Sequence, residues 1–149
     1  MSSPYYGTTV GAGHFFDLTC YNDIDYSDYS DEPPPDLVLS IDVPAGSQIT
    51  FQQTTANYNS MYELRWGESC PGETYVACGF WGDSGSVTWV NTESTTQTVY
   101  YIQSGSAIRI YHDDSGAFTL DWWFSGELPL PQPCDACAEW RQLSTGVVL

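Results

Sequence analysis

Apolar and polar residues alternate through most of the middle of the chain. Leu37, Leu39 and Ile41 are each separated by one residue from the next, and a second alternation starts at Ile49 after a Pro-Ala-Gly turn. An alternation with a period of two residues is typical of strands that bury one face in an antiparallel sheet. The pattern therefore predicts a pair of antiparallel strands around this turn.

The same alternation recurs along the chain, and turn-forming Gly, Pro, Asn, Asp and Ser residues separate the segments. Many short strands with regular turns indicate an all-β fold, an antiparallel, jelly-roll-like β-sandwich of about eight to nine strands with extended terminal segments. The predicted strands are 14–19, 36–43, 48–54, 61–66, 74–80, 86–91, 96–103, 107–111 and 117–124.

This pattern divides the chain into three parts. Residues 1–13 form an N-terminal extended segment, residues 14–124 the sandwich domain, and residues 125–149 a proline-rich linker with a C-terminal extension. Each terminal part carries aromatic residues, Tyr5 and Tyr6 in the first and Trp140 in the last. Extended segments with alternating apolar residues can add a strand to the open edge of a sheet, so we expect these residues to take part in assembly.

The charge balance excludes two classes of partner. The chain has 19 acidic residues, three arginines and no lysine, and its formal net charge is -16. Binding to nucleic acid requires basic residues that neutralise phosphates, and docking on an anionic membrane requires them as well. No apolar run reaches the ~18 residues that a membrane-spanning helix needs, so we expect no membrane insertion.

Five cysteines indicate an oxidising, extracellular compartment, and hence a secreted protein. Cys70 and Cys78 flank a short segment that can turn back on itself, and we expect them to form a disulfide. Cys20 is then expected to pair with Cys134 or Cys137, and one cysteine is left over. The C-x-x-C motif at 134–137 lacks the strand-helix context of a redox site and the further ligands of a zinc site.

Five motifs follow one another in the order GTTVGAGHFFDLTC, PDLVLSIDVPAGSQITFQQT, MYELRWGESCPGETYVAC, VYYIQSG and SGAFTLDW. In this order the chain resembles the bacterial pre-peptidase C-terminal domain, a family similar to the collagen-binding domains of secreted collagenases. The resemblance covers residues 7–124 approximately. It implies a calcium-tolerant β-sandwich that accompanies secreted proteins and has no catalytic activity of its own.

Acidic residues are dense in the segment before the first long strand. Asp23, Asp25, Asp28 and Asp36 lie in this segment, without the glycine and glutamate spacing of an EF-hand. Calcium takes six to eight oxygen ligands and accepts irregular loops. We therefore expect any bound metal to be calcium held by these four residues, and the alternative is a solvated acidic loop.

Two tryptophans are candidates for a binding or assembly surface. In the strand 117–124, alternation places Trp122 on the apolar face and Trp123 on the opposite one, and Trp81 lies near the end of another strand. Exposed tryptophans stack on sugar rings or anchor interfaces. The alternative is burial of Trp81 and Trp123 in the core of the domain.

Catalytic motifs are weak. The chain has no Gly-x-Ser-x-Gly motif, and its Gly-Asp-Ser-Gly sequence at 82–85 lacks the upstream histidine segment of a trypsin-like protease. We expect no enzymatic activity. The expected function is that of a secreted structural or adhesive module that self-assembles into a filament or surface layer through its termini. The alternatives are an accessory domain that binds a collagen-like or polysaccharide polymer outside the cell and a small hydrolase.

Overall fold

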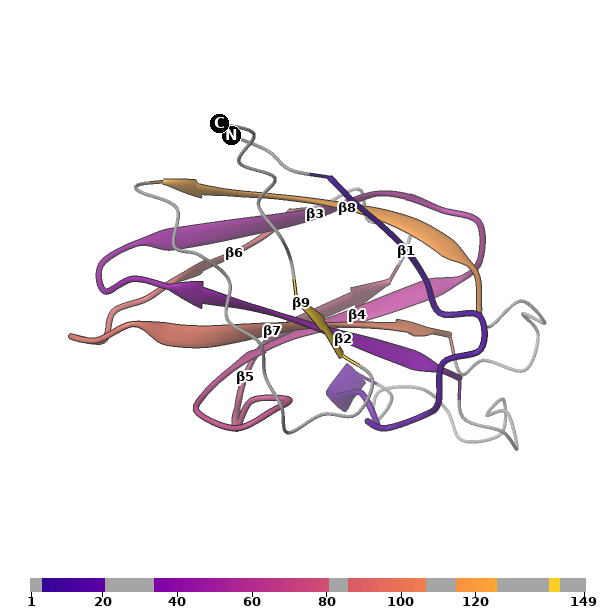
Figure 1. The fold of residues 1–149 in the computed structure, drawn as a ribbon, viewed down its shortest axis with the longest axis horizontal. Coiled ribbons are helices and arrows are strands. Elements are labelled where there is room, and N and C mark those ends of the chain that lie inside the picture. The colour runs from indigo at the N-terminus through magenta and orange to yellow at the C-terminus, as the bar shows by residue number, and fades with distance from the viewer. Residues whose placement is uncertain (1–3, 21–33, 81–85, 107–114, 126–139, 143–149) are drawn as a thin grey trace.

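The fold is a β-sandwich of two sheets, as predicted (Figure 1). The computed structural model describes residues 4–20, 34–80, 86–106, 115–125 and 140–142. Its four-stranded sheet has the order β1-β8-β3-β6 and its five-stranded sheet the order β5-β4-β7-β2-β9. The strands are β1 Tyr5–Thr8, β2 Asp36–Val43, β3 Gln48–Ala56, β4 Ser60–Trp66, β5 Thr74–Phe80, β6 Ser86–Val90, β7 Gln97–Gly105, β8 Ala117–Ser125 and β9 Trp140–Gln142.

The main core lies between the two sheets, where alternate residues of each strand point inward. In β8 the inward residues Phe118, Leu120, Trp122 and Phe124 are all buried, as their alternation predicted. They pack against the inward residues of the five-stranded sheet. The buried residues that the five-stranded sheet adds to this core are Leu37, Leu39, Ile41, Val43, Leu64, Val99 and Tyr101.

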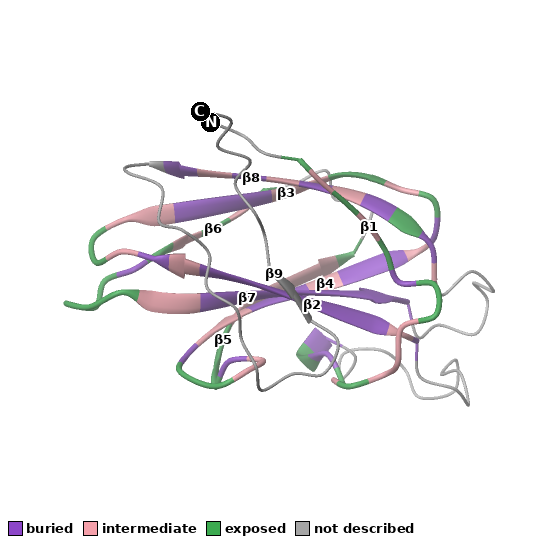
Figure 2. Ribbon diagram, viewed as in Figure 1, coloured by how far each residue is buried: buried purple, intermediate pink, exposed green. Residues whose placement is uncertain are grey.

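A second, smaller core covers the outer face of the five-stranded sheet. Val38, Met61 and Ile102 point away from the main core, yet all three are buried because Leu18 and Cys20 pack over them. The purple colour of β2 along almost its whole length shows the result (Figure 2). Only Asp42 among the residues of β2 is less than fully buried.

Seven predicted strands are present with boundaries shifted by at most two residues, and two predictions need comment. The predicted strand 14–19 is wrong, because this segment has no ladder partner and its N–H groups donate to carboxylates of β2 and β4. The predicted strand 107–111 lies outside the described residues.

The sandwich also includes residues that the sequence analysis placed in the terminal segments. β1 pairs with β8 in antiparallel register from Tyr5↔Leu120 to Thr8↔Ala117. β9 pairs with β2 in parallel register over three residues, from Val38↔Trp140 to Ser40↔Gln142. Each terminal part of the chain therefore supplies the outer edge strand of one sheet (Figure 1).

Candidate functional site

The residues 13–20, which we call the N-terminal strap, run across the outer face of the five-stranded sheet. The strap starts beyond β1 and ends in a short 3₁₀ turn at Thr19 and Cys20. Leu18 is 2% exposed and packs against the apolar residues of that face. A segment without ladder bonds must satisfy its buried N–H groups elsewhere, and two buried carboxylates do this.

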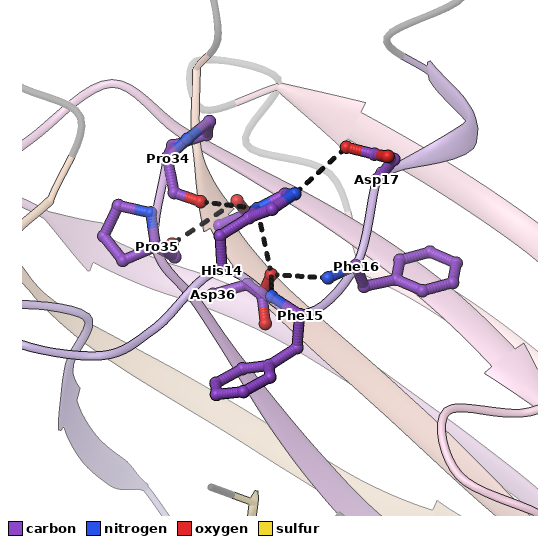
Figure 3. A network of polar contacts seen from close by, with 8 residues as sticks. His14, Phe15, Phe16, Asp17, Pro34, Pro35 and Asp36 are labelled. Carbon is purple, nitrogen blue, oxygen red and sulfur yellow. Dashed lines mark hydrogen bonds and ion pairs between the residues drawn. The ribbon is translucent and has the colours of Figure 1, made fainter. Parts of the chain in front are cut away.

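Asp36 holds the beginning of the strap. Its carboxylate is fully buried, and Oδ2 accepts hydrogen bonds from the N–H groups of Phe15 at 2.8 Å and Phe16 at 2.9 Å (Figure 3). The N–H of Asp36 in turn donates to the carbonyl of Gly13 at 2.9 Å. Burial raises the pKa of Asp36, although the two backbone hydrogen bonds and nearby His14 act in the opposite direction.

His14 joins the strap to the residues that precede β2. Its Nδ1 lies 2.9 Å from the carbonyl oxygen of Pro34, and its Nε2 lies 3.0 Å from Oδ1 of Asp17 (Figure 3). Nδ1 is also 3.4 Å from Oδ2 of Asp36. Because a carbonyl and a carboxylate only accept, a ring protonated on both nitrogens makes both hydrogen bonds at once.

Glu63 of β4 holds the end of the strap. Its Oε2 accepts from the N–H of Thr19 at 2.5 Å, and its Oε1 accepts from the hydroxyl of Thr19 at 3.0 Å. Arg65 completes the set, since its Nη1 lies 2.6 Å from Oε1 of Glu63 and its guanidinium lies 5.1 Å from the ring centre of Phe16. The buried charge of Glu63 is thus paired and hydrogen-bonded, which a buried carboxylate requires.

The disulfide of the site joins Cys20 to Cys78, so the predicted pair Cys70–Cys78 is wrong, and so is the pairing of Cys20 with Cys134 or Cys137. The reason lies in the strand register. Cys78 is the partner of Glu63 across β4 and β5, and the hydrogen bonds from Thr19 to Glu63 bring the next residue over Cys78. The two Cα atoms are 6.1 Å apart, and Cys70 packs against the same cluster.

The other predicted site residues are dispersed. Tyr5 packs against Phe118 with 5.9 Å between ring centres, while Tyr6 is 77% exposed. Trp123 is half-buried on the outer face of the four-stranded sheet. Trp140 lies in β9, an edge strand of the five-stranded sheet. Trp81 lies outside the described residues.

The calcium site stays a prediction. Asp23, Asp25 and Asp28 lie outside the described residues, and Asp36 already accepts two backbone hydrogen bonds through Oδ2. Within the described ranges, the one group of potential metal ligands is Cys20, Glu63 and Cys78, whose sulfur atoms form the disulfide. The polar chemistry of this face therefore serves to fix the strap in place.

Sequence reasoning did not identify Glu63 or His14 as anchors of the strap. A signal for Glu63 was present, because it is the one acidic residue in the strand 60–66 and faces away from the main core. A buried outward position indicates that another segment covers the sheet. His14 contacts Pro34 and Asp36, which lie about 20 residues further along the sequence and come beside it only in the folded chain. No sequence pattern therefore indicated its role.

Comparisons with known proteins add no relative. A scan against protein-family models finds no match, and searches of curated proteins and of solved structures find none either. The resemblance to the pre-peptidase C-terminal domain therefore stays a prediction from the sequence motifs. In the described part of the chain, no helix combines the length and hydropathy that crossing a bilayer requires.

Proposed function

We propose that this chain is a secreted, non-catalytic structural module that self-assembles through its terminal segments. The observation that carries the proposal is the placement of the two terminal strands. β1 is the outer strand of one sheet and β9 is the outer strand of the other. A strand that ends a sheet can make the same backbone bonds with the edge of a neighbouring copy.

The disulfide supports the secreted location. Cys20 and Cys78 are 58 residues apart in the sequence and are joined across the outer face of the five-stranded sheet. Structural disulfides persist in oxidising compartments and are rare in the reducing cytosol. The net charge of -16 is also in keeping with a surface that stays in solution by self-repulsion before assembly.

Two truncations test the proposal. One removes residues 1–10, which carry no charged side chain, and the other removes residues 138–149, whose only charged side chains are Glu139 and Arg141. Both truncations therefore leave the formal net charge unchanged, so a change in association reports the loss of a strand. Light scattering over a concentration series and electron microscopy measure the assembly.

We expect the intact chain to form larger species as its concentration rises, and at least one truncated chain to lose this property. If both truncated chains match the intact chain in size and shape at every concentration, the proposal is wrong. Circular dichroism of each truncated chain provides the control that the sandwich is still folded.

An accessory, polymer-binding domain is the second candidate. It is favoured by the exposed aromatic residues Tyr75 and Phe80 on β5, at the edge of the five-stranded sheet opposite β9. Aromatic side chains on an accessible strand can stack on sugar rings or pack on an extended polymer. Binding of soluble polysaccharides or collagen peptides that disappears in a Tyr75→Ala, Phe80→Ala variant would favour this candidate.

A further inference from the structure

The outer face of the five-stranded sheet is apolar beneath the N-terminal strap. In antiparallel sheets such a face is commonly polar, because water covers it. Here Val38, Met61 and Ile102 are buried on that face, and Phe16 and Leu18 of the strap pack on their cluster. The position of the strap therefore decides whether these apolar side chains meet water.

The strap is a cover over the sheet and not one of its strands. No described strand forms a ladder with it. The N–H groups of Phe15 and Phe16 donate to the carboxylate of Asp36 (Figure 3), and that of Thr19 donates to Glu63. The strands β2, β4 and β7 beneath it pair with one another. The strap can consequently open as a local unit without breaking the ladders of the sheet.

Within the described residues, one covalent bond ties the strap to the sheet, the disulfide between Cys20 and Cys78. The hydrogen bonds of the strap can be exchanged for bonds to water when it opens. The disulfide cannot be exchanged in this way, and it keeps the end of the strap beside β5 whenever those hydrogen bonds open. It therefore decides whether an opened strap leaves the sheet or closes again.

The two sulfur atoms of this disulfide differ in their access to a reductant. Cys20 is 8% exposed, whereas Cys78 is half-buried on β5, the edge strand of the five-stranded sheet. Access is one of the properties that decide which sulfur atom a thiolate attacks. The difference in exposure directs the attack to Cys78 and makes Cys20 the leaving group.

Glu63 lies beside both sulfur atoms, and its charge is balanced. One of its carboxylate oxygens is within 4.8 Å of the Sγ atoms of Cys20 and Cys78. Nη1 of Arg65 lies 2.6 Å from Oε1 of the same carboxylate. A thiolate is stabilised beside an arginine. The thiolate of Cys20 therefore forms next to an ion pair, which repels it less than a lone carboxylate would.

From these observations we propose that the Cys20–Cys78 disulfide is a redox lock on the N-terminal strap. In oxidising surroundings the strap covers the outer face of the five-stranded sheet. When a small thiol of the glutathione class reduces the disulfide, the strap leaves that face while both sheets stay folded, and reoxidation restores the cover. The inference goes beyond the proposed function and holds whether or not the chain assembles.

The reduction takes two exchange steps. A thiolate of the reductant attacks Sγ of Cys78, a mixed disulfide forms, and Cys20 leaves as a thiolate that takes a proton from the solvent. A second reductant thiolate attacks the reductant's sulfur atom in this mixed disulfide and releases the thiolate of Cys78, which is protonated in turn. Two reductant molecules thus become one disulfide and supply the two electrons that the bond in the protein takes up.

The test isolates this bond from the other cysteines. Cys70 is itself disulfide-bonded, so a reductant added to the intact chain acts on more than one bond. A variant with Cys70→Ser, Cys134→Ser and Cys137→Ser keeps Cys20 and Cys78 as its only cysteines. The matched control carries Cys20→Ser and Cys78→Ser in addition and contains no cysteine. Circular dichroism of each chain, with and without reductant, checks that the sheets are folded.

Amide hydrogen exchange at one pH, read by mass spectrometry, compares the oxidised and the reduced variant. We expect the amides of Phe15, Phe16 and Thr19 to exchange at least about tenfold faster after reduction, and those of Leu64 and Val99 in the sheet to change by a much smaller factor. The control without cysteine should show the fast strap rates with and without reductant. Equal strap rates in the two redox states, or a rise at Leu64 and Val99 as large as in the strap, overturns the proposal.

A second experiment uses the intact chain and tests the route of reduction. The folded chain is exposed briefly to reduced glutathione, free thiols are blocked with iodoacetamide, and the peptides are mapped by mass spectrometry. We expect the first modified form of this disulfide to carry glutathione on Cys78 and the blocking group on Cys20. Glutathione on Cys20 instead overturns the route through Cys78. A disulfide that is reduced only after the chain has been unfolded in urea overturns the lock itself.

Discussion

The two ends of this chain cover the sandwich by different physical means. The N-terminal part joins one sheet through β1 and then crosses the other sheet as a strap that two buried carboxylates and a disulfide hold. The C-terminal part joins through three parallel residue pairs of β9. Covering an edge and being fixed to it are therefore separate properties. Within the described residues, the N-terminal part is tied by side chains and a covalent bond, and β9 is described through its backbone pairing.

The largest effect should come from breaking the covalent anchor of the strap. A Cys20→Ser, Cys78→Ser variant should lose about 4 kcal/mol of unfolding free energy, the chain-entropy value for a loop of 58 residues. Urea unfolding of this variant and of the intact chain measures the loss. A loss below about 1 kcal/mol would mean that the hydrogen bonds alone hold the strap, and the contrast between the two ends would weaken.

Removing Glu63 should have the next largest effect. Glu63→Ala leaves the N–H of Thr19 and the guanidinium of Arg65 without their buried acceptor, which should destabilise the fold by about 3 kcal/mol. Glu63→Gln keeps an acceptor in place and serves as the control, with a smaller loss. Equal unfolding free energies for Glu63→Ala and the intact chain would contradict the role of Glu63 as an anchor.

Tyr101 provides a test in the main core, away from both ends. Its hydroxyl is fully buried without a hydrogen-bond partner among the described residues, and burial raises its pKa well above the usual value. Tyr101→Phe removes an unsatisfied polar group and should stabilise the fold by about 1 kcal/mol. Thermal unfolding measures this change, and a marked loss of stability would show that the hydroxyl has a partner after all.

Asp36 should give the smallest effect, seen as a dependence on pH. Burial raises the pKa of Asp36 in the folded state above its unfolded value, so the folded chain binds more protons. Its contribution to stability is therefore fully present below the unfolded pKa of about 4 and is lost as the pH rises through the folded pKa. Asp36→Asn cannot ionise at this position. The unfolding free energy of the intact chain, taken relative to that of Asp36→Asn, should therefore fall as the pH rises through the folded pKa of Asp36.

The measurement is urea unfolding of both chains at a series of pH values from about 3 upward. His14 contacts Asp36, and Asp17 contacts His14. Both residues are present in both chains, so the difference in unfolding free energy between the chains isolates the effect of Asp36. A constant difference across the series would show that Asp36 does not titrate with a raised pKa in the fold.

The sequence predicted the sandwich well because its inner faces follow a simple alternation. Leu37, Leu39 and Ile41 in β2, and Phe118 and Leu120 in β8, lie in the core as the period-two pattern requires. The turn after Val43 joins β2 to β3, but the two strands lie in different sheets, so the prediction that they pair with each other is wrong. The alternation depends on residues close together in the chain.

The candidate site depends instead on contacts between distant residues, which the sequence does not display. The alternation of residues 14–19 is that of a strand, yet their N–H groups bond to side chains because Asp36 and Glu63 are buried beneath them. The partner of Cys78 followed from the register of β4 and β5, which no local pattern specifies.

Amide hydrogen exchange of the monomeric intact chain, read by mass spectrometry, tests the central contrast most directly. We predict that the amides of Trp140–Gln142 exchange far faster than those of Phe15, Phe16 and Thr19, since opening β9 breaks three parallel pairs whereas opening the strap disrupts two buried carboxylate sites. Equal or greater protection of Trp140–Gln142 would contradict the account, because β9 would then be fixed to its own sheet as firmly as the strap.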